Sequence, residues 1–124
     1  MSATFNHTII PATDRNESAT FFRELLDLQA APAWGIFTNV RLDGDALLQF
    51  AEPPFEIQMQ HYAFLVDDAQ FDRTHVRLRG RGIEFWADPQ MTRPGETNTE
   101  HGGRGVYFKA PAGHAIEVIT RPYL

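Results

Sequence analysis

The chain has 124 residues, a hydrophobic fraction of 43% and a charged fraction of 22%, values typical of one globular domain with a sizeable core. Its formal net charge of −5 gives no attraction toward nucleic acids or anionic membranes, and the absence of cysteine excludes disulfides, thiolate zinc sites and a cysteine nucleophile. No apolar run approaches the roughly 18 residues that span a bilayer, and residues 1–7 lack a secretory signal pattern, so we expect a cytoplasmic protein.

The N-terminal residues predict a strand followed by a helix. Residues 4–11 contain aromatic and β-branched side chains and end at a proline, which cannot continue a ladder. Asp14 followed by Glu17 has the spacing of a capping box, and apolar residues then recur at helical spacing. We therefore expect a helix that begins after Asp14 and runs to Leu28.

A hairpin is predicted next. Residues 30–32 form a connector, and residues 34–42 are aromatic and β-branched, which favours a strand. Asp43-Gly44-Asp45 has the composition of a hairpin turn, and residues 46–50 form the return strand. The two prolines at 53–54 cannot donate to a ladder and indicate a short linker within the domain.

The second half predicts the same kinds of element. We expect a strand over residues 57–66, a helix that follows Asp67-Asp68 and runs to Arg79, and a short strand over 83–86. Residues 88–104 are polar and rich in glycine, proline and threonine, and a loop of that length in a small domain is often functional. Residues 105–121 form a closing hairpin around a Pro-Ala-Gly turn.

The two halves share an internal repeat. His7 lies seven residues before Asp14, and His61 lies seven residues before Asp68, with a period of 54 residues between the histidines. The first strand of each half thus bears a histidine at the same distance from the predicted cap of its helix, Asp14 or Asp68. We predict an α+β fold of two pseudo-symmetric βαβββ modules whose sheets curve around a cleft. The predicted modules are residues 4–52 and 56–122 of a single domain, 1–124.

Three strand residues form a candidate metal site. Glu117 shares its strand face with Ala115 and Ile119, where a lone carboxylate is costly without a partner. His7 and His61 also lie on predicted strands, and equivalent histidines of two related modules should converge on one cleft. Two imidazoles and one carboxylate match a facial triad with open coordination positions. We therefore predict a divalent metal on His7, His61 and Glu117; the alternative is three separate strand residues, each with its own hydrogen bond.

Three motifs resemble the vicinal oxygen chelate superfamily, which includes glyoxalase I, fosfomycin- and bleomycin-resistance proteins and extradiol dioxygenases. They are Asn6-His7-Thr8-Ile9-Ile10, Gln60-His61-Tyr62-Ala63-Phe64 and the stretch from Gly105 to Glu117. The resemblance covers residues 4–122 and implies paired βαβββ modules, usually a homodimer, with a divalent metal at the predicted triad. Fe²⁺ is the metal we favour, and Mn²⁺, Ni²⁺, Co²⁺ and Zn²⁺ are compatible. Alanines at 110 and 112 replace aspartates of the family turn, outside the metal positions.

The first module lacks a second carboxylate. Depending on the register, the counterpart of Glu117 is Leu48 or Gln49. A resemblance to glyoxalase I implies a second glutamate that acts as a base, so its absence favours the extradiol dioxygenases over an isomerase. Gln49 can bind the metal weakly or form a hydrogen bond with the substrate. The alternative is that it is a polar strand residue that points outward.

Residues 84–89, 93–96 and 102–105 resemble a narrower set of small superfamily members, among them an oxygenase that rearranges an aromatic polyketide on the chartreusin pathway. Tyr107 matches a tyrosine that contacts the metal-bound ligand in related resistance enzymes, so we predict a catalytic role for it. Several aromatic residues form either a wall for a flat substrate or part of the core. These aromatic residues are Trp34, Phe37, Phe50, Trp86 and Tyr107.

The predicted substrate-binding residues are Gln49, Trp34, Phe50 and Arg104. Arg104 and His101 end the long loop, where they close over the cleft, bind an acidic group or remain at the surface. We expect His75 to be a surface or packing residue and His114 a structural one.

The leading functional hypothesis is a metal-dependent oxygenase of dioxygenase type that acts on an aromatic or quinone-like small molecule. One alternative is a glyoxalase-like lyase or isomerase, or a thiol transferase, with the same metal. The other is a metal-free protein that sequesters a drug, as bleomycin-resistance proteins do. The complete predicted triad favours an enzyme over a binding protein.

Overall fold

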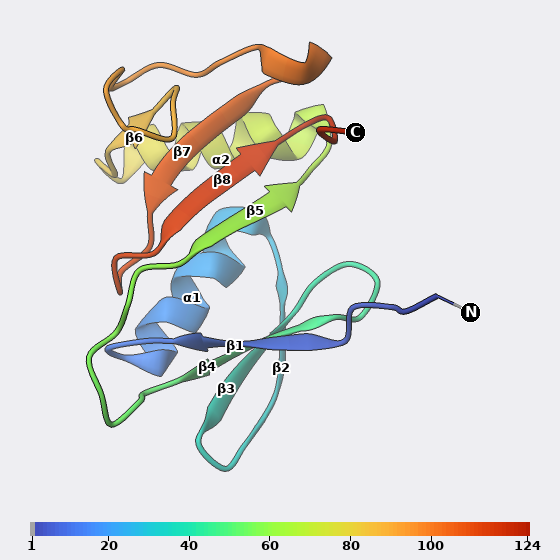
Figure 1. Ribbon diagram of the computed structural model, residues 1–124, viewed down its shortest axis with the longest axis vertical. Coiled ribbons are helices and arrows are strands. Elements are labelled where there is room, and N and C mark those ends of the chain that lie inside the picture. Colours follow the sequence, from blue (N-terminus) through green and yellow to red (C-terminus); the bar gives the residue numbers. More distant parts are fainter. Residues whose placement is uncertain (1) are drawn as a thin grey trace. The chain divides into compact units, whose positions relative to one another are not determined.

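The computed structural model describes residues 2–124 and consists of two units with the same succession of elements. Unit 1 ends at Gln58, and unit 2 begins at Met59. Each unit has a strand, a helix and three further strands, which form a four-stranded sheet (Figure 1). The predicted α+β class with two βαβββ modules is confirmed. Across residues 2–124, no helix combines the length and the apolar character needed to cross a membrane.

Unit 1 has the strand order β1-β4-β3-β2. Strand β1 runs parallel to β4, whereas the β4–β3 and β3–β2 pairs are antiparallel. The elements are β1 (His7–Pro11), α1 (Arg15–Leu26), β2 (Gln29–Trp34), β3 (Phe37–Arg41) and β4 (Leu47–Ala51).

Unit 2 repeats this topology with the order β5-β8-β7-β6, in which β5 runs parallel to β8. The β8–β7 and β7–β6 pairs are antiparallel. The elements are β5 (His61–Leu65), α2 (Asp68–Gly80), β6 (Phe85–Trp86), the 3-10 helix η1 (Glu100–Gly102), β7 (Gly105–Lys109) and β8 (Ala115–Ile119).

Helix α1 starts where the sequence predicts. The Asp14 side chain accepts hydrogen bonds from the backbone N–H groups of Asn16 and Glu17, both at 3.0 Å, which satisfies two donors exposed at the helix start. The helix ends at Leu26 rather than at Leu28, because Asp27 adopts a left-handed conformation with φ of 55°.

Helix α2 is capped by Asp67, whose carboxylate accepts from the backbone N–H of Gln70 at 2.8 Å. Asp68 is the first helical residue, so the equal spacing of His7–Asp14 and His61–Asp68 does not mark equivalent caps. The repeat is better defined by the strands, since His7 and His61 are the first residues of β1 and β5.

Both of these strands begin later than predicted. His7 pairs with Leu47, and His61 pairs with Ala115, each of which is the first residue of the parallel partner strand. The carbonyls of Asn6 and Gln60 each accept one further hydrogen bond, from the backbone N–H groups of Leu47 and Ala115, and residues 4–6 and 57–60 are not strand.

The segment from 29 to 42 corrects two predictions. Residues 30–32, predicted as a connector, belong to β2, and the single strand predicted over 34–42 is interrupted by a turn after Trp34. Strand β2 lies at the sheet edge and has an irregular register between Ala31 and Trp34, which is where a proline is tolerated. Gly35, with φ of 57°, allows the chain to reverse.

One face of each sheet packs against the helix of its unit (Figure 1). In unit 1 the rings of Phe50 and Phe22 lie 5.3 Å apart, and strand alternation turns the neighbouring Gln49 to the opposite face. In unit 2 Ile116 and Val118 are fully buried, and Glu117 between them points the other way. We call the faces turned away from α1 and α2 the open faces; they carry most of the predicted site residues.

The long loop over residues 88–104 is held by its own hydrogen bonds. The buried Asp88 carboxylate accepts from the backbone N–H and hydroxyl groups of Thr92 and from the backbone N–H of Arg93. The hydrogen bond from the Thr92 hydroxyl, more than any other interaction, lowers the pKa of the Asp88 carboxyl below its usual range. A bridge between Asn98 and Gly105 then returns the chain to the sheet.

We predict that Asp88→Ala destabilises the protein in a pH-dependent manner. Because the folded-state pKa of Asp88 is lowered, its contribution to stability is complete above about pH 4 and is lost as the pH falls through the folded-state pKa. Urea unfolding should show a larger difference between wild type and variant at about pH 7 than at about pH 3. Asp43→Ala, in the exposed β3–β4 turn, is the control. An equal difference at both pH values would contradict the prediction.

Candidate functional site

Glu117 is a carboxylate in the middle of the open face of unit 2. It lies on β8, paired with Ala63 of β5 on one side and Tyr107 of β7 on the other. Its exposed fraction is only 3%. A carboxylate at that depth requires partners, because burial of an unpaired charge is strongly unfavourable.

Three side chains supply those partners. Oε1 of Glu117 lies 3.0 Å from Nε2 of His61, the first residue of β5. Oε2 accepts a hydrogen bond from the Tyr107 hydroxyl at 2.9 Å and another from the hydroxyl of Tyr123. Both carboxylate oxygens are therefore satisfied by residues of the same unit.

The two phenols are held in their protonated form. Burial, followed by hydrogen bonds to Tyr123 and Glu117, raises the pKa of Tyr107. The hydrogen bond to Glu117 is the main cause that raises the pKa of Tyr123. Both hydroxyls consequently act as donors near neutral pH, and they direct their protons toward the carboxylate charge.

Tyr123 is the site residue that the sequence analysis missed. It lies in the C-terminal segment after β8, six residues beyond Glu117, where no strand or helix pattern fixes the direction of a side chain. The ring of His101, from the end of the long loop, stacks on Tyr123 with centroids 4.2 Å apart. The one feature of the sequence that could have indicated this role is a tyrosine shortly after the strand that carries Glu117.

The His61–Glu117 pair fits a divalent metal ion. An imidazole nitrogen and a carboxylate oxygen are ligands that first-row divalent metals accept. Two cis ligands with bonds of about 2.1 Å at a right angle lie about 3.0 Å apart, which matches the observed 3.0 Å separation. The His61 side chain is 47% exposed, whereas the Glu117 side chain is 4% exposed, so solvent reaches the pair from the imidazole side.

The third predicted ligand, His7, belongs to unit 1. Within either unit taken alone, residues 2–58 or 59–124, no group of three histidine, aspartate or glutamate side chains is arranged to hold a metal. The triad of His7, His61 and Glu117 therefore stays a prediction, of which unit 2 supplies an adjacent pair.

The strand register identifies Gln49 as the counterpart of Glu117. Gln49 pairs with Ile9, two residues after His7, just as Glu117 pairs with Ala63, two residues after His61. Of the two registers considered, the one that placed Leu48 at this position is excluded. Gln49 is 5% exposed and lies on the open face of unit 1.

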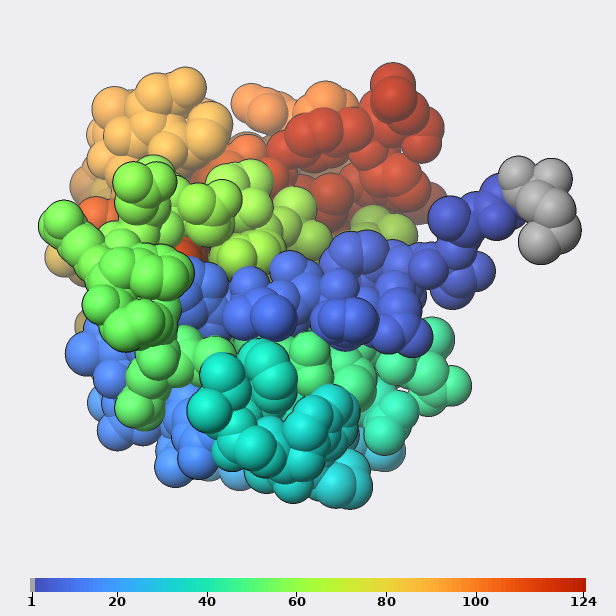
Figure 2. Space-filling model, turned by 60° about the horizontal axis from the view of Figure 1, so that its bottom comes forward, coloured from blue at the N-terminus to red at the C-terminus, as the bar shows by residue number. Residues whose placement is uncertain are grey.

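The other predicted substrate-binding residues lie in different environments. Trp34, the last residue of β2, is 53% exposed. The turn that joins β2 to β3 belongs to the cyan part of the surface in Figure 2. Phe50 is fully buried against Phe22, so its packing in the core of unit 1 contradicts its prediction as a substrate-binding residue.

Arg104 is bound to helix α2. Its guanidinium group donates to Asp72 at 2.8 Å and to Asp68 at 3.2 Å, and it lies 4.5 Å from the centroid of the Phe71 ring. These contacts fix the start of β7 onto the helix, and a role of Arg104 in substrate binding stays a prediction.

Two further histidines have the packing roles expected of them. Nδ1 of the buried His114 accepts a hydrogen bond from the backbone N–H of Gln60 at 3.0 Å. His75 meets the ring of Phe85 edge-on, with centroids 5.2 Å apart. Burial, reinforced by Arg79 and Arg104, lowers the pKa of His75.

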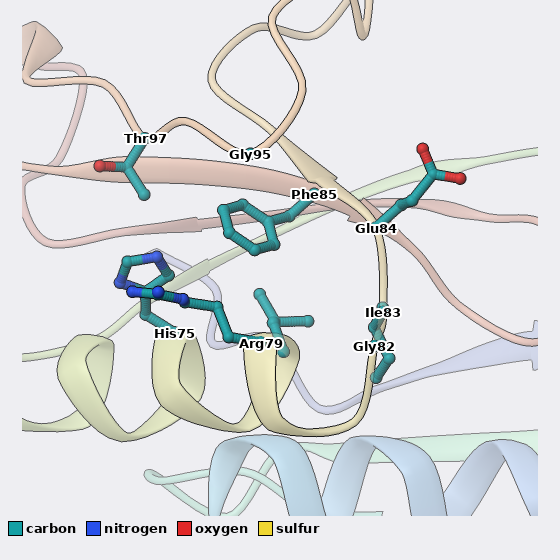
Figure 3. Close-up of a pocket in the computed structure, with 9 residues that line it drawn as sticks. His75, Arg79, Gly82, Ile83, Glu84, Phe85, Gly95 and Thr97 are labelled. Carbon is teal, nitrogen blue, oxygen red and sulfur yellow. The ribbon is translucent and has the colours of Figure 1, made fainter.

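A surface pocket of about 570 Å³ lies on the helix side of unit 2. Figure 3 shows His75 and Arg79 rising from α2 toward Phe85, while Glu84 points away from them. Phe85 is aligned across the sheet with Phe108 and Ile116 on the face opposite Glu117. The pocket thus contains none of the predicted site residues.

Comparison with known proteins identifies close relatives. The family model of the Glyoxalase/Bleomycin resistance protein/Dioxygenase superfamily matches residues 4–118. Two solved structures are similar over nearly the whole chain. Oxidase ChaP-H1 has 48% identity and a TM-score of 0.94 over 98% of each chain. Oxidase ChaP-H2 has 43% identity and a TM-score of 0.95 over 99% of this chain and 97% of the other. Glutathione transferase FosA from Serratia marcescens is 30% identical over 95% of this chain and 81% of that protein.

We predict that the charge of Glu117 delays ionisation of Tyr107 and Tyr123 in the metal-free protein. Raised folded-state pKa values leave stability unaffected below about pH 10 and reduce it as the pH rises further, because the unfolded chain then loses its phenolic protons first. In Glu117→Gln, two of the three tyrosines should ionise at lower pH than in the wild type.

Absorbance of the phenolate during alkaline titration measures this shift. Tyr62, whose pKa is raised by burial alone, should titrate equally in both proteins and serves as an internal reference. Glu84→Gln is the matched control for loss of a carboxylate. Identical titration curves for wild type and Glu117→Gln would refute the coupling.

Proposed function

We propose an oxygenase function for this chain, which belongs to the Glyoxalase/Bleomycin resistance protein/Dioxygenase superfamily. The substrate would be an aromatic or quinone-like small molecule, and the reaction would depend on a divalent metal. The observation that carries the proposal is the buried Glu117 carboxylate, placed 3.0 Å from His61 and hydrogen-bonded by two tyrosines. Similarity to two oxidases, at 48% and 43% identity over nearly the full chain, supports the oxidative assignment.

His61, Glu117 and His7 would hold the metal. When bound, a divalent metal supplies a Lewis acid that binds two neighbouring substrate oxygens and stabilises negative charge that develops on them. Fe²⁺ is the ion we favour, with Mn²⁺, Ni²⁺, Co²⁺ and Zn²⁺ as compatible ions. We also propose a homodimer, in which His7 is contributed by the same chain or by the second copy.

Tyr107 would act on the substrate through its single hydroxyl proton. That proton is donated to Oε2 of Glu117, and it can be given to a substrate oxygen only if the Tyr107 hydroxyl turns away from the carboxylate. Because Tyr123 donates to the same Oε2 atom, Glu117 retains a donor during this exchange. Tyr123 is thus proposed as a positioning residue that permits Tyr107 to change partner.

Gln49 argues against an isomerase. An isomerase that moves a proton between adjacent carbons needs a base, and the neutral amide of Gln49 occupies the position equivalent to Glu117. A thiol transferase with the same metal is the second candidate, supported by the 30% identity to FosA. A metal-free binding protein is the third candidate. The His61–Glu117 pair argues against it, because a binding protein without a metal has no function for these two ligands.

We predict that His61→Ala and Glu117→Ala abolish metal retention while the fold persists. Each variant removes one of two adjacent ligands, and His61 is half-exposed at the start of an edge strand. Tyr123→Phe keeps the ligands and removes one donor to Glu117, so metal affinity should fall by about 10–100-fold. Metal content after purification and calorimetric titration measure these effects.

His75→Ala is the matched control, because it removes a histidine on the opposite side of the sheet of unit 2. Circular dichroism establishes that each variant is folded. Unchanged metal stoichiometry in both ligand variants would rule out the proposed site.

The reaction class is tested by substrate assays with the metal-loaded protein. We expect oxygen consumption in the presence of catechols, at a rate above that of the free metal, and loss of this activity in Glu117→Ala. Thiol-dependent turnover of methylglyoxal or of fosfomycin, without oxygen consumption, would establish a lyase or a transferase instead. Absence of all three activities from a protein that retains metal would refute the oxygenase proposal.

A further inference from the structure

Lys109 is the one lysine of the chain, and it lies on the open face of unit 2. The chain has 11 lysine and arginine residues together, so all the others are arginines. On β7 the side chains of Val106 and Phe108 are fully buried, and strand alternation turns Tyr107 and Lys109 to the open face. Lys109 is exposed, and its ammonium group makes no hydrogen bond or ion pair within residues 2–124.

The strand register places Lys109 in the same row as His61. Strands β5, β8 and β7 lie side by side (Figure 1), and Ala115 of β8 pairs with His61 on one side and with Lys109 on the other. Because neighbouring strands are spaced by about 4.8 Å, the Cα atoms of Lys109 and His61 lie about 10 Å apart. Tyr107 and Glu117 form the next row of the same face. The lysine and the histidine thus stand on opposite sides of a small alanine, over which a flat ring can lie.

The equivalent residue of unit 1 is also a cation. Arg41 pairs with Leu47, and Leu47 pairs with His7, so Arg41 stands two strands away from the histidine of its own unit. Nη1 of Arg41 lies 3.8 Å from Oδ1 of Asp45, which belongs to the hairpin turn that follows. Unit 1 therefore supplies an anion to this cation from its own turn.

The hairpin turn of unit 2 supplies no anion to Lys109. Residues 42–46 and 110–114 join equivalent strands, and the first of these turns contains two aspartates, whereas the second reads Ala-Pro-Ala-Gly-His. The carboxylate on the open face, that of Glu117, is already bound by one imidazole and two phenols. Lys109 is thus a cation available to a ligand that binds beside the His61–Glu117 pair.

The ammonium group of a lysine selects for negative charge. It is a compact point charge on a flexible four-carbon stem, so it can follow a carboxylate without a fixed bonding geometry. A neutral substituent at the same place forms no ion pair with it. An aromatic ligand whose two neighbouring oxygens face the His61–Glu117 pair would direct its opposite side toward Lys109.

We propose that Lys109 binds an ionised acid group of the substrate, of which a carboxylate is the simplest, on the side of the ring opposite the two oxygens expected at the metal. This inference rests on the proposed oxygenase function and narrows its substrate to an aromatic acid with two neighbouring hydroxyls. Lys109 is then a residue that determines specificity.

The test is calorimetric titration of the Zn²⁺-loaded protein, in which the metal cannot change its oxidation state. The probes are 3,4-dihydroxybenzoate and its methyl ester, which have the same ring and hydroxyls and differ in charge. The ratio of affinities for the acid and the ester should be about three- to fivefold higher in the wild type than in Lys109→Gln. This difference should shrink at about 0.5 M salt, because an exposed ion pair is screened.

Two further variants separate the position of the charge from its presence. Lys109→Arg keeps a cation at the same place and should keep the ratio of the wild type. Arg79→Gln removes a cation from the helix side of unit 2 and should also keep this ratio. Circular dichroism establishes that each variant is folded.

A second measurement uses the single lysine as a spectroscopic probe. Reductive methylation with ¹³C-formaldehyde labels Lys109 and the N-terminal amine and preserves both positive charges. At equal saturation, the ¹³C-methyl signal of Lys109 should shift more with the acid than with the ester. The signal of the N-terminal amine is the internal reference.

The outcomes separate this inference from the proposed function. Binding of both compounds with the same ratio in wild type and Lys109→Gln would overturn the role of Lys109 and leave the oxygenase proposal intact. Equal shifts of the Lys109 signal with acid and ester would overturn it as well. Absence of binding of both compounds by a wild-type protein that retains its metal would overturn the oxygenase proposal and this inference with it.

Discussion

The buried charge of Glu117 is the constraint on which the open face of unit 2 depends. A carboxylate that is 3% exposed loses most of its hydration, and the fold compensates with one imidazole and two phenols. These partners come from three separate segments: the start of β5, the middle of β7 and the residues after β8. The ladders of β8 already hold β5 and β7, and the carboxylate adds the side-chain link that ties the C-terminal segment to them through Tyr123.

Local sequence patterns predicted much of this arrangement. Alternation of apolar residues located β8 and the direction of Glu117, and the Asp14 cap located the start of α1, because both depend on neighbours within a few residues. The edge strand β2 was not predicted, since Pro32 disfavours a ladder and only pairing with β3 reveals the strand. Tyr123 was missed for the same reason: its role depends on Glu117 across the sheet rather than on adjacent residues. Phe50 was predicted to contact the substrate because its residue type does not show whether the side chain lies on the helix face or on the open face of the sheet.

The two units show how one topology supports different chemistry. Their sheets have equivalent strand orders, and the registers place Gln49 and Asn39 where unit 2 has Glu117 and Tyr107. The backbone is the same at these positions, and only the side chains decide whether the face carries a charge. Unit 1 has two neutral amides at these positions, whereas unit 2 has a carboxylate and a phenol that donates to it, so only unit 2 offers an anionic ligand to a cation. At these positions the internal repeat is thus conserved in geometry but not in charge.

The pairing of β1 with β4 also has a consequence during synthesis of the chain. Every ladder of unit 1 closes between residues 7 and 51, so its sheet is complete in sequence before any strand of unit 2 has been translated. Domains generally fold as units with the N-terminal part first as the chain leaves the ribosome. Unit 1 can therefore form its core of Phe22 and Phe50 on the nascent chain before the strands of unit 2 are available.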